Sequence, residues 1–256
     1  PEVATVGKTE EDLKAAGAMA VILKDAAWPN LLQTTENTPV LIHAGPFGNI
    51  ATGNSSIIAD QVGIRTADFV ITEAGFGADM GAERFFNVKC RTSGLTPDVA
   101  VLVVTVRALK AHSGRFRIVP GRPLPEDLLA PCPESVRGGA ENLRKHIDIV
   151  KSFGVNPVVA INRFANDHDV DIEEIERIAR EAGVHSAIST HVVDGGPGAT
   201  ALAEAVVAAS AQPTDFRYTY DLDEPLEAKL EAVATKVYGA DGIDIAGKAA
   251  SDLKAF

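Results

Sequence analysis

Five short apolar runs, rich in β-branched side chains, constrain the fold of this chain more than any other feature. They cover residues 39–44, 69–73, 99–106, 156–162 and 186–190. Each is followed by a stretch with helical spacing, a pattern typical of βαβ units and a mainly parallel sheet. Because the runs are continuously apolar, helices are expected on both faces. The sequence therefore predicts a doubly wound α/β domain with function at the carboxyl ends of its strands.

The most apolar runs, 99–106 and 156–162, are predicted to be adjacent central strands. Five helices are predicted between and beyond the runs. They cover residues 10–24, 55–66, 140–153, 172–182 and 199–211. Gly183 follows the fourth of them, at a position that favours a helix C-cap.

Residues 115–139 break this rhythm with five prolines among several arginines. Such a segment buries too little apolar area to offset its ordering entropy, so it is predicted to be a loop, either a lid or a mobile insertion. The composition changes again after Thr214. Residues 1–213 are therefore predicted to form the α/β domain, and 214–256 the start of another domain or a closing helical segment.

Charge and cysteine content limit the partners and the compartment. The 256 residues include 24 Lys and Arg against 35 Asp and Glu, a formal net charge of −11, which disfavours nucleic acid as a partner. The apolar runs are too short to cross a membrane. Cys90 and Cys132 have no CxxC partner, and the start of the chain has no signal-peptide pattern. A cytoplasmic protein is predicted.

The segment from Glu73 to Phe86 (EAGFGADMGAERFF) partly resembles a dinucleotide-binding fingerprint. After Gly75 and Gly77 that fingerprint needs a third glycine at position 80, which is Met80, so a Rossmann oxidoreductase is disfavoured. The glycines instead indicate a close approach of the backbone to a ligand or to another chain segment. Phe76, between them, is expected to stack on something.

Two regions could bind an anion, although the phosphate-binding pattern GxxxxGK followed by Ser or Thr is absent from the 256 residues. The glycine-rich loop 43–56 offers backbone N–H groups and a helix N-terminus. Its candidate residues are Asn49, Asn54 and Ser55, and the alternative is a tight loop capped by Asn54 or Ser55. Arg107 and Lys110, after the strand at 99–106, could neutralise phosphate or carboxylate, or could form an ordinary solvated surface.

Four segments together resemble the formate–tetrahydrofolate ligase family, also called 10-formyltetrahydrofolate synthetase. They cover residues 12–60, 67–98, 103–114 and 238–243. The resemblance implies an enzyme that couples ATP cleavage to the joining of formate and tetrahydrofolate through a formyl phosphate intermediate. It also implies a homotetramer that uses Mg²⁺ and a monovalent cation.

The resemblance extends to a folate site. Phe76 of EAGFGAD and Phe164 of INRFAND match aromatic residues that the family places near the pteridine, and Asn162 in the same motif is a further cleft candidate. Ala165 stands where the family usually has proline, and Val192 where it usually has tryptophan. Loss of a stacking ring is expected to weaken folate binding by on the order of 1 kcal/mol.

The family's phosphate-binding loop has no counterpart here. Together with the first residue, Pro1, and last residues that read as the start of a helix that is cut off, this indicates a piece of a longer protein. The resemblance then implies a sheet of the P-loop NTPase type without its P-loop strand, catalytic groups mainly in an upstream segment, and a fragment inactive on its own. The alternative is a non-catalytic folate- or nucleotide-binding module associated with a ligase, which the upstream reading frame would distinguish.

Overall fold

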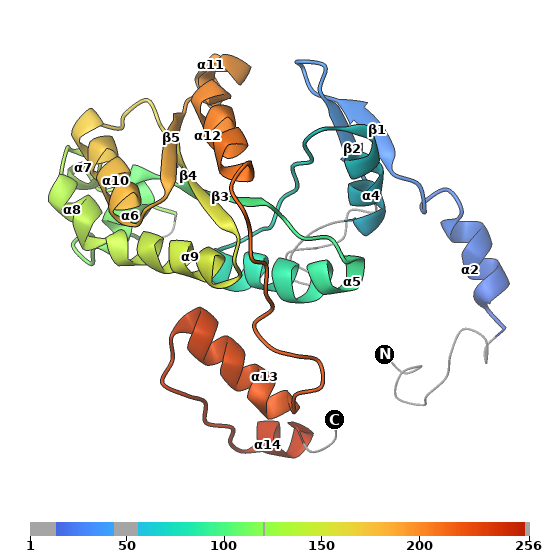
Figure 1. The fold of residues 1–256 in the computed structure, drawn as a ribbon. Coiled ribbons are helices and arrows are strands. Elements are labelled where there is room, and N and C mark those ends of the chain that lie inside the picture. Colours follow the sequence, from blue (N-terminus) through green and yellow to red (C-terminus); the bar gives the residue numbers. More distant parts are fainter. Residues whose placement is uncertain (1–13, 44–55, 120, 254–256) are drawn as a thin grey trace.

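The computed structural model describes residues 14–43, 56–119 and 121–253, and its centre is a three-stranded parallel sheet (Figure 1). The strand order is β3 (Val99–Val104), β4 (Asn156–Asn162) and β5 (His185–Ser189). The register sets Val104 beside Ile161 and Asn162 beside Ser189, so the three carboxyl ends share one edge. The predicted adjacency of the runs at 99–106 and 156–162 is confirmed, although among the described residues only β4 has a neighbour on each side.

Strand β4 is buried on both faces, as its unbroken apolar sequence predicted. Val159 and Ile161 belong to the largest core cluster, which helices on one side of the sheet complete. Val158 and Ala160 point to the other face, where α12 (Thr200–Ser210) packs across the strands (Figure 1). The helices of the first face are α6 (Val106–His112), α8 (Pro133–Gly138), α9 (Ala140–Ser152) and α10 (Asp169–Glu181).

Helix α10 illustrates why these segments become helices. Ile172, Ile175 and Ile178 recur at helical spacing and are fully buried against the sheet. The helix ends at Glu181, and Gly183 follows with a φ of 67°, the left-handed conformation that glycine adopts without strain. The predicted end of this helix is therefore confirmed.

A second core cluster joins distant parts of the chain below the sheet. Phe86, Phe153 and Val237 are buried together, and the ring of Phe216 lies 6.0 Å from that of Phe86. Phe216, Tyr218, Val233 and Val237 thus pack directly against the α/β unit. The cluster includes residues of the π-helical turns η1 (Ala78–Ala82), η2 (Phe85–Cys90) and η4 (Val233–Tyr238). Helix α5 (Arg91–Ser93) follows η2, α13 (Leu226–Ala232) precedes η4, and α14 (Lys248–Leu253) comes last, all three without buried residues.

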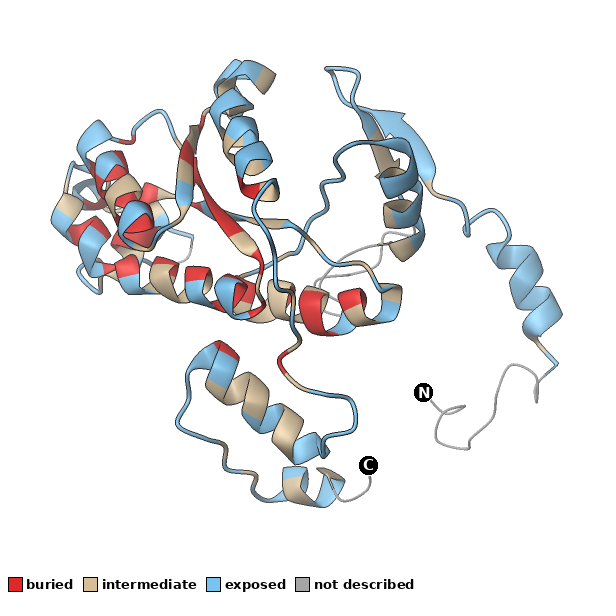
Figure 2. Cartoon of the chain, in the orientation of Figure 1, coloured by how far each residue is buried: buried red, intermediate tan, exposed pale blue. Residues whose placement is uncertain are grey.

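Two of the five predicted strands do not join the parallel sheet. Residues 39–42 form β2 (Pro39–Ile42), which pairs antiparallel with β1 (Asn30–Gln33) in a separate hairpin. Residues 69–73 form no strand, and Ile71 is almost fully exposed. Helices α2 (Ala16–Leu23) and α4 (Ile57–Thr66) flank this hairpin in the sequence. Figure 2 shows the contrast between this largely exposed part and the buried residues around β4, α9 and α10.

The predicted loop 115–139 contains two short helices, α7 (Glu126–Leu129) and α8. Leu128 and Val136 are fully buried, and Val136 belongs to the main core cluster. The segment is therefore packed over its second half, because two well-placed apolar side chains are enough to anchor a proline-rich stretch. Among the described residues, no helix is both long and apolar enough to cross a membrane.

Candidate functional site

Three of the predicted site residues follow the three parallel strands at their common carboxyl edge. Arg107 lies in the first turn of α6, directly after β3, and Phe164 lies two residues after the end of β4. Val192 lies in α11 (His191–Asp194), directly after β5. Asn162, half-buried, is the last residue of β4. The topology therefore brings residues that are 85 positions apart in the sequence to one edge of the sheet.

Arg107 and Phe164 are in direct contact there. The guanidinium carbon of Arg107 lies 4.3 Å from the centre of the Phe164 ring, a cation–π arrangement. The Arg107 Nε lies 4.0 Å from the Asp167 Oδ1. Thr105 fixes the start of α6, because its hydroxyl accepts a hydrogen bond from the Ala108 N–H at 3.1 Å. The predicted candidate Arg107 is thus part of the same constellation as the predicted aromatic residue.

A tight turn fixes the Phe164 backbone. The Phe164 N–H donates to the Asp167 Oδ2 at 2.9 Å, and the Asp167 N–H donates to the Phe164 carbonyl at 3.0 Å. The Asp167 carboxylate is buried, whereas Phe164 is 40% exposed. Sequence reasoning missed Asp167, although an Asp three residues after an aromatic at a strand end is a turn signal that could have revealed it.

The two positions that depart from the resembled motif are both exposed. Ala165 lies in the Phe164 turn, and Val192 is 77% exposed on α11. Beside it, the Ser189 hydroxyl and the His191 Nδ1 lie 2.8 Å apart and share a hydrogen bond. The Val192 side chain is thus largely open to solvent.

Lys110 does not belong to this edge, which corrects its assignment as a phosphate candidate. Its side chain is 1% exposed, and its Nζ lies 2.5 Å from the Asp171 Oδ2 and donates to the Ala130 carbonyl at 2.7 Å. The Asp171 Oδ1 accepts a hydrogen bond from the Cys132 N–H at 2.9 Å. Lys110 shares the buried stripe of α6 with Val106 and Leu109, so its ammonium ties α6 to α10 and to the end of α7.

Phe76 occupies a strained turn of its own. Its φ is 60°, a left-handed conformation that is uncommon for a residue with a side chain, and its ring is 63% exposed. The glycines of this turn serve close packing within the chain. A Cβ at Gly77 would lie 2.8 Å from the Cε1 of His146 on α9, and one at Gly81 would lie 1.6 Å from the Gly75 carbonyl oxygen. The interpretation of these glycines as an approach to another chain segment is confirmed. That Phe76 and Phe164 face one cleft stays a prediction.

His146, which the sequence reasoning also missed, supports the Phe76 turn. Its Nδ1 accepts a hydrogen bond from the Ala78 N–H at 3.2 Å, so the ring is oriented with that nitrogen unprotonated. Burial lowers the pKa of His146, and the nearby carboxylate of Asp79 partly opposes this. A cation at this position is therefore disfavoured, and His146 acts on the turn as a neutral acceptor.

The candidates Asn49, Asn54 and Ser55 lie outside the described residues. The helix that follows them, α4, is capped by Ser56, whose hydroxyl accepts from the Ala59 N–H at 3.0 Å. The cap is therefore one residue later than Ser55 and two later than Asn54, the two predicted cap residues.

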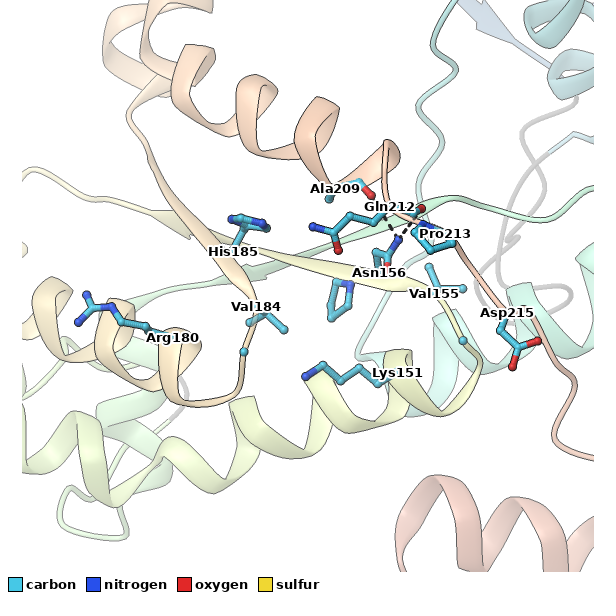
Figure 3. Close-up of a pocket in the computed structure, with 13 residues that line it drawn as sticks. Lys151, Val155, Asn156, Arg180, Val184, His185, Ala209, Gln212, Pro213 and Asp215 are labelled. Carbon is cyan, nitrogen blue, oxygen red and sulfur yellow. Dashed lines mark hydrogen bonds between the residues drawn. The ribbon is translucent and has the colours of Figure 1, made fainter.

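A hollow of about 540 Å³ lies at the opposite, amino edge of the sheet (Figure 3). It lies between the starts of β4 and β5 and the ends of α9, α10 and α12. The Asn156 amide donates to the carbonyls of Ala209 and Gln212, and the Lys151 Nζ donates to the Ala182 carbonyl. These groups satisfy helix C-termini, and none of the predicted site residues lines the hollow.

Comparison with known proteins decides the family. The sequence profile described as formate--tetrahydrofolate ligase matches residues 4–256. The chain belongs to the formate–tetrahydrofolate ligase family. It is 66% identical to the formate--tetrahydrofolate ligase of Cutibacterium acnes and 59% identical to that of Saccharopolyspora erythraea. A third relative, formate--tetrahydrofolate ligase 3 of Rubrobacter xylanophilus, is 55% identical.

The alignments with these ligases cover nearly all of this chain but less than half of each relative. Each alignment covers 96% of this chain but 43% or 44% of the relative. The chain thus spans less than half the length of the curated family members it matches. The carboxyl-edge residues Arg107, Phe164 and Val192 all lie inside the matched range of the family profile.

Proposed function

We propose that these residues form part of an ATP-dependent ligase that joins formate to tetrahydrofolate and yields 10-formyltetrahydrofolate. Membership of the formate–tetrahydrofolate ligase family, with 66% identity to one relative over 96% of the chain, is the observation that supports this most strongly. In this proposal the sheet is of the P-loop NTPase type, and formyl phosphate is the intermediate that the folate N10 attacks. The complete enzyme is a cytoplasmic homotetramer.

The carboxyl edge of the sheet is the proposed folate site. Phe164 offers a half-exposed ring on a turn whose backbone Asp167 fixes, so the ring is available for stacking on a pteridine. Phe76 offers a second exposed ring, held in a conformation that costs free energy, and such strain is frequent at functional sites. Ala165 and Val192 provide space in place of a proline and a further ring.

The chemistry at phosphate is assigned to other residues. Arg107 contacts Phe164 and Lys110 is buried in an ion pair, so neither offers a free cation for a triphosphate. In the described residues, no three His, Cys, Asp or Glu side chains gather to hold a metal ion, and we derive no step through Mg²⁺ or a monovalent cation. We therefore place ATP and formate against groups outside the described ranges.

The test is Phe164→Ala in the complete polypeptide that carries these residues. We expect the KM for tetrahydrofolate to rise about tenfold, because a lost aromatic stack is worth on the order of 1 kcal/mol, while the KM for ATP stays unchanged. The matched control is Phe69→Ala, since Phe69 is also exposed but belongs to the segment 69–73, which does not join the parallel sheet. Equal increases in both KM values would show that Phe164 has only a structural role.

A further inference from the structure

One nitrogen of the Arg107 guanidinium, beside the Phe164 ring, is buried without a hydrogen-bond partner. The Nε of Arg107 is the sole buried side-chain nitrogen or oxygen, across the ranges described, that has no hydrogen-bond partner. Its nearest carboxylate oxygen, on Asp167, is 4.0 Å away and thus too distant for a hydrogen bond. A buried donor without a partner costs free energy and needs an explanation.

The surroundings show what holds this guanidinium in place. The other carboxylate oxygen of Asp167 accepts the Phe164 N–H, so Asp167 serves the turn. What remains for Arg107 is the face of the Phe164 ring at 4.3 Å and the charge of the buried Asp167 at longer range. The position of the guanidinium is therefore coupled to the ring and not to a hydrogen-bonded anion.

We propose that Arg107 is a positioning residue for Phe164. Its planar cation occupies one face of the ring, fixes the ring's orientation and leaves the opposite face for the pteridine of the folate substrate. This inference rests on the proposed function, since it assigns a role within the same site. It also replaces the expectation that Arg107 binds phosphate, because its charge already compensates the buried carboxylate of Asp167.

The chemistry of arginine makes the proposal specific. A guanidinium is flat and weakly hydrated and stacks on an aromatic face, whereas a lysine ammonium is a compact, strongly hydrated point charge. If Arg107 acted by attracting an anion, lysine would preserve much of its effect. If it acts by stacking, lysine will not replace it.

The experiment is a double-mutant cycle in the complete enzyme, with Arg107→Met, Phe164→Leu and the double variant. Tetrahydrofolate Kd and the KM values of both substrates are the readouts. We expect Arg107→Met and Arg107→Lys each to raise the tetrahydrofolate Kd three- to tenfold without changing the KM for ATP. In the Phe164→Leu background, Arg107→Met should add little, because no ring remains to be positioned.

Arg163→Met is the matched control. Arg163 lies on the same edge, but its guanidinium pairs with the exposed Asp169 at 2.8 Å, and its removal should leave the tetrahydrofolate Kd unchanged. Loss of Arg107 also leaves the buried Asp167 carboxylate without its cation. If Arg107→Met does not fold, the variant Arg107→Met/Asp167→Asn removes both charges and is used in the same cycle.

The outcomes separate this inference from the proposed function. An unchanged tetrahydrofolate Kd in Phe164→Leu would overturn the folate site itself. An effect of Phe164→Leu with none of Arg107→Met would overturn only the positioning role. Full activity of Arg107→Lys, or the same fold-change for Arg107→Met in both backgrounds, would also overturn it.

Discussion

Lys110→Met is expected to be among the most destabilising single substitutions in this chain. Lys110 and Asp171 form an ion pair in which the two side chains are 1% and 0% exposed. Methionine preserves most of the apolar stem but leaves the Asp171 carboxylate buried without its cation and the Ala130 carbonyl without its donor. Removal of one partner from a buried pair typically costs about 3–5 kcal/mol.

Urea unfolding of the 256-residue chain measures this effect. With a slope of about 3 kcal/mol per M for a chain of this size, a loss of 3–5 kcal/mol lowers the midpoint by roughly 1 M or more. The double variant Lys110→Met/Asp171→Asn should recover part of the loss, since no uncompensated charge then remains. In this double variant, the amide oxygen of the asparagine that replaces Asp171 can still accept a hydrogen bond from the Cys132 N–H.

Lys248→Met is the matched control for the buried pair. Lys248 and Asp252 also form a Lys–Asp pair at 2.5 Å, but both side chains are largely exposed. An exposed pair contributes about 0–1 kcal/mol, so the midpoint should hardly move. If Lys110→Met costs no more than Lys248→Met, then Lys110 is not buried as described and returns as a candidate for binding phosphate.

Two further predictions concern acid stability and the segment 115–139. The guanidinium of Arg177, with that of Arg137, lowers the pKa of Glu174 to about 2 from its ordinary 4.5. The contribution of ionised Glu174 to the free energy of unfolding is therefore complete above pH 4.5 and lost as the pH falls toward 2. This loss is on the order of 1 kcal/mol after screening of the exposed arginines, and acid unfolding of Glu174→Gln should lack it. Leu128→Ala should cost about 2–5 kcal/mol and accelerate proteolysis between residues 115 and 139; unchanged cleavage would show that α7 is not anchored by Leu128.

The sequence alone determined the parallel part of the fold. Continuous apolarity in β4 requires a cover on both faces, and α9, α10 and α12 provide it. The end of α10 was equally predictable, because Gly183 adopts a positive φ there. These are local properties: side-chain periodicity and backbone freedom depend on a few neighbouring residues. The resemblance to a known family likewise rested on contiguous motifs.

Tertiary structure decided which of these local patterns acquire partners. Residues 69–73 are as β-prone as a true strand, yet they form none in the described chain, because a strand requires a neighbouring edge and not only suitable side chains. Arg107 and Lys110 are three residues apart on α6 and looked equivalent in sequence. Because α6 packs against α8 and α10, Lys110 is buried in the core. Arg107 instead lies at the carboxyl edge, in contact with the Phe164 ring. The sequence shows that both side chains are charged, but whether each is buried depends on contacts with Phe164 and Asp171, which lie 57 and 61 positions away.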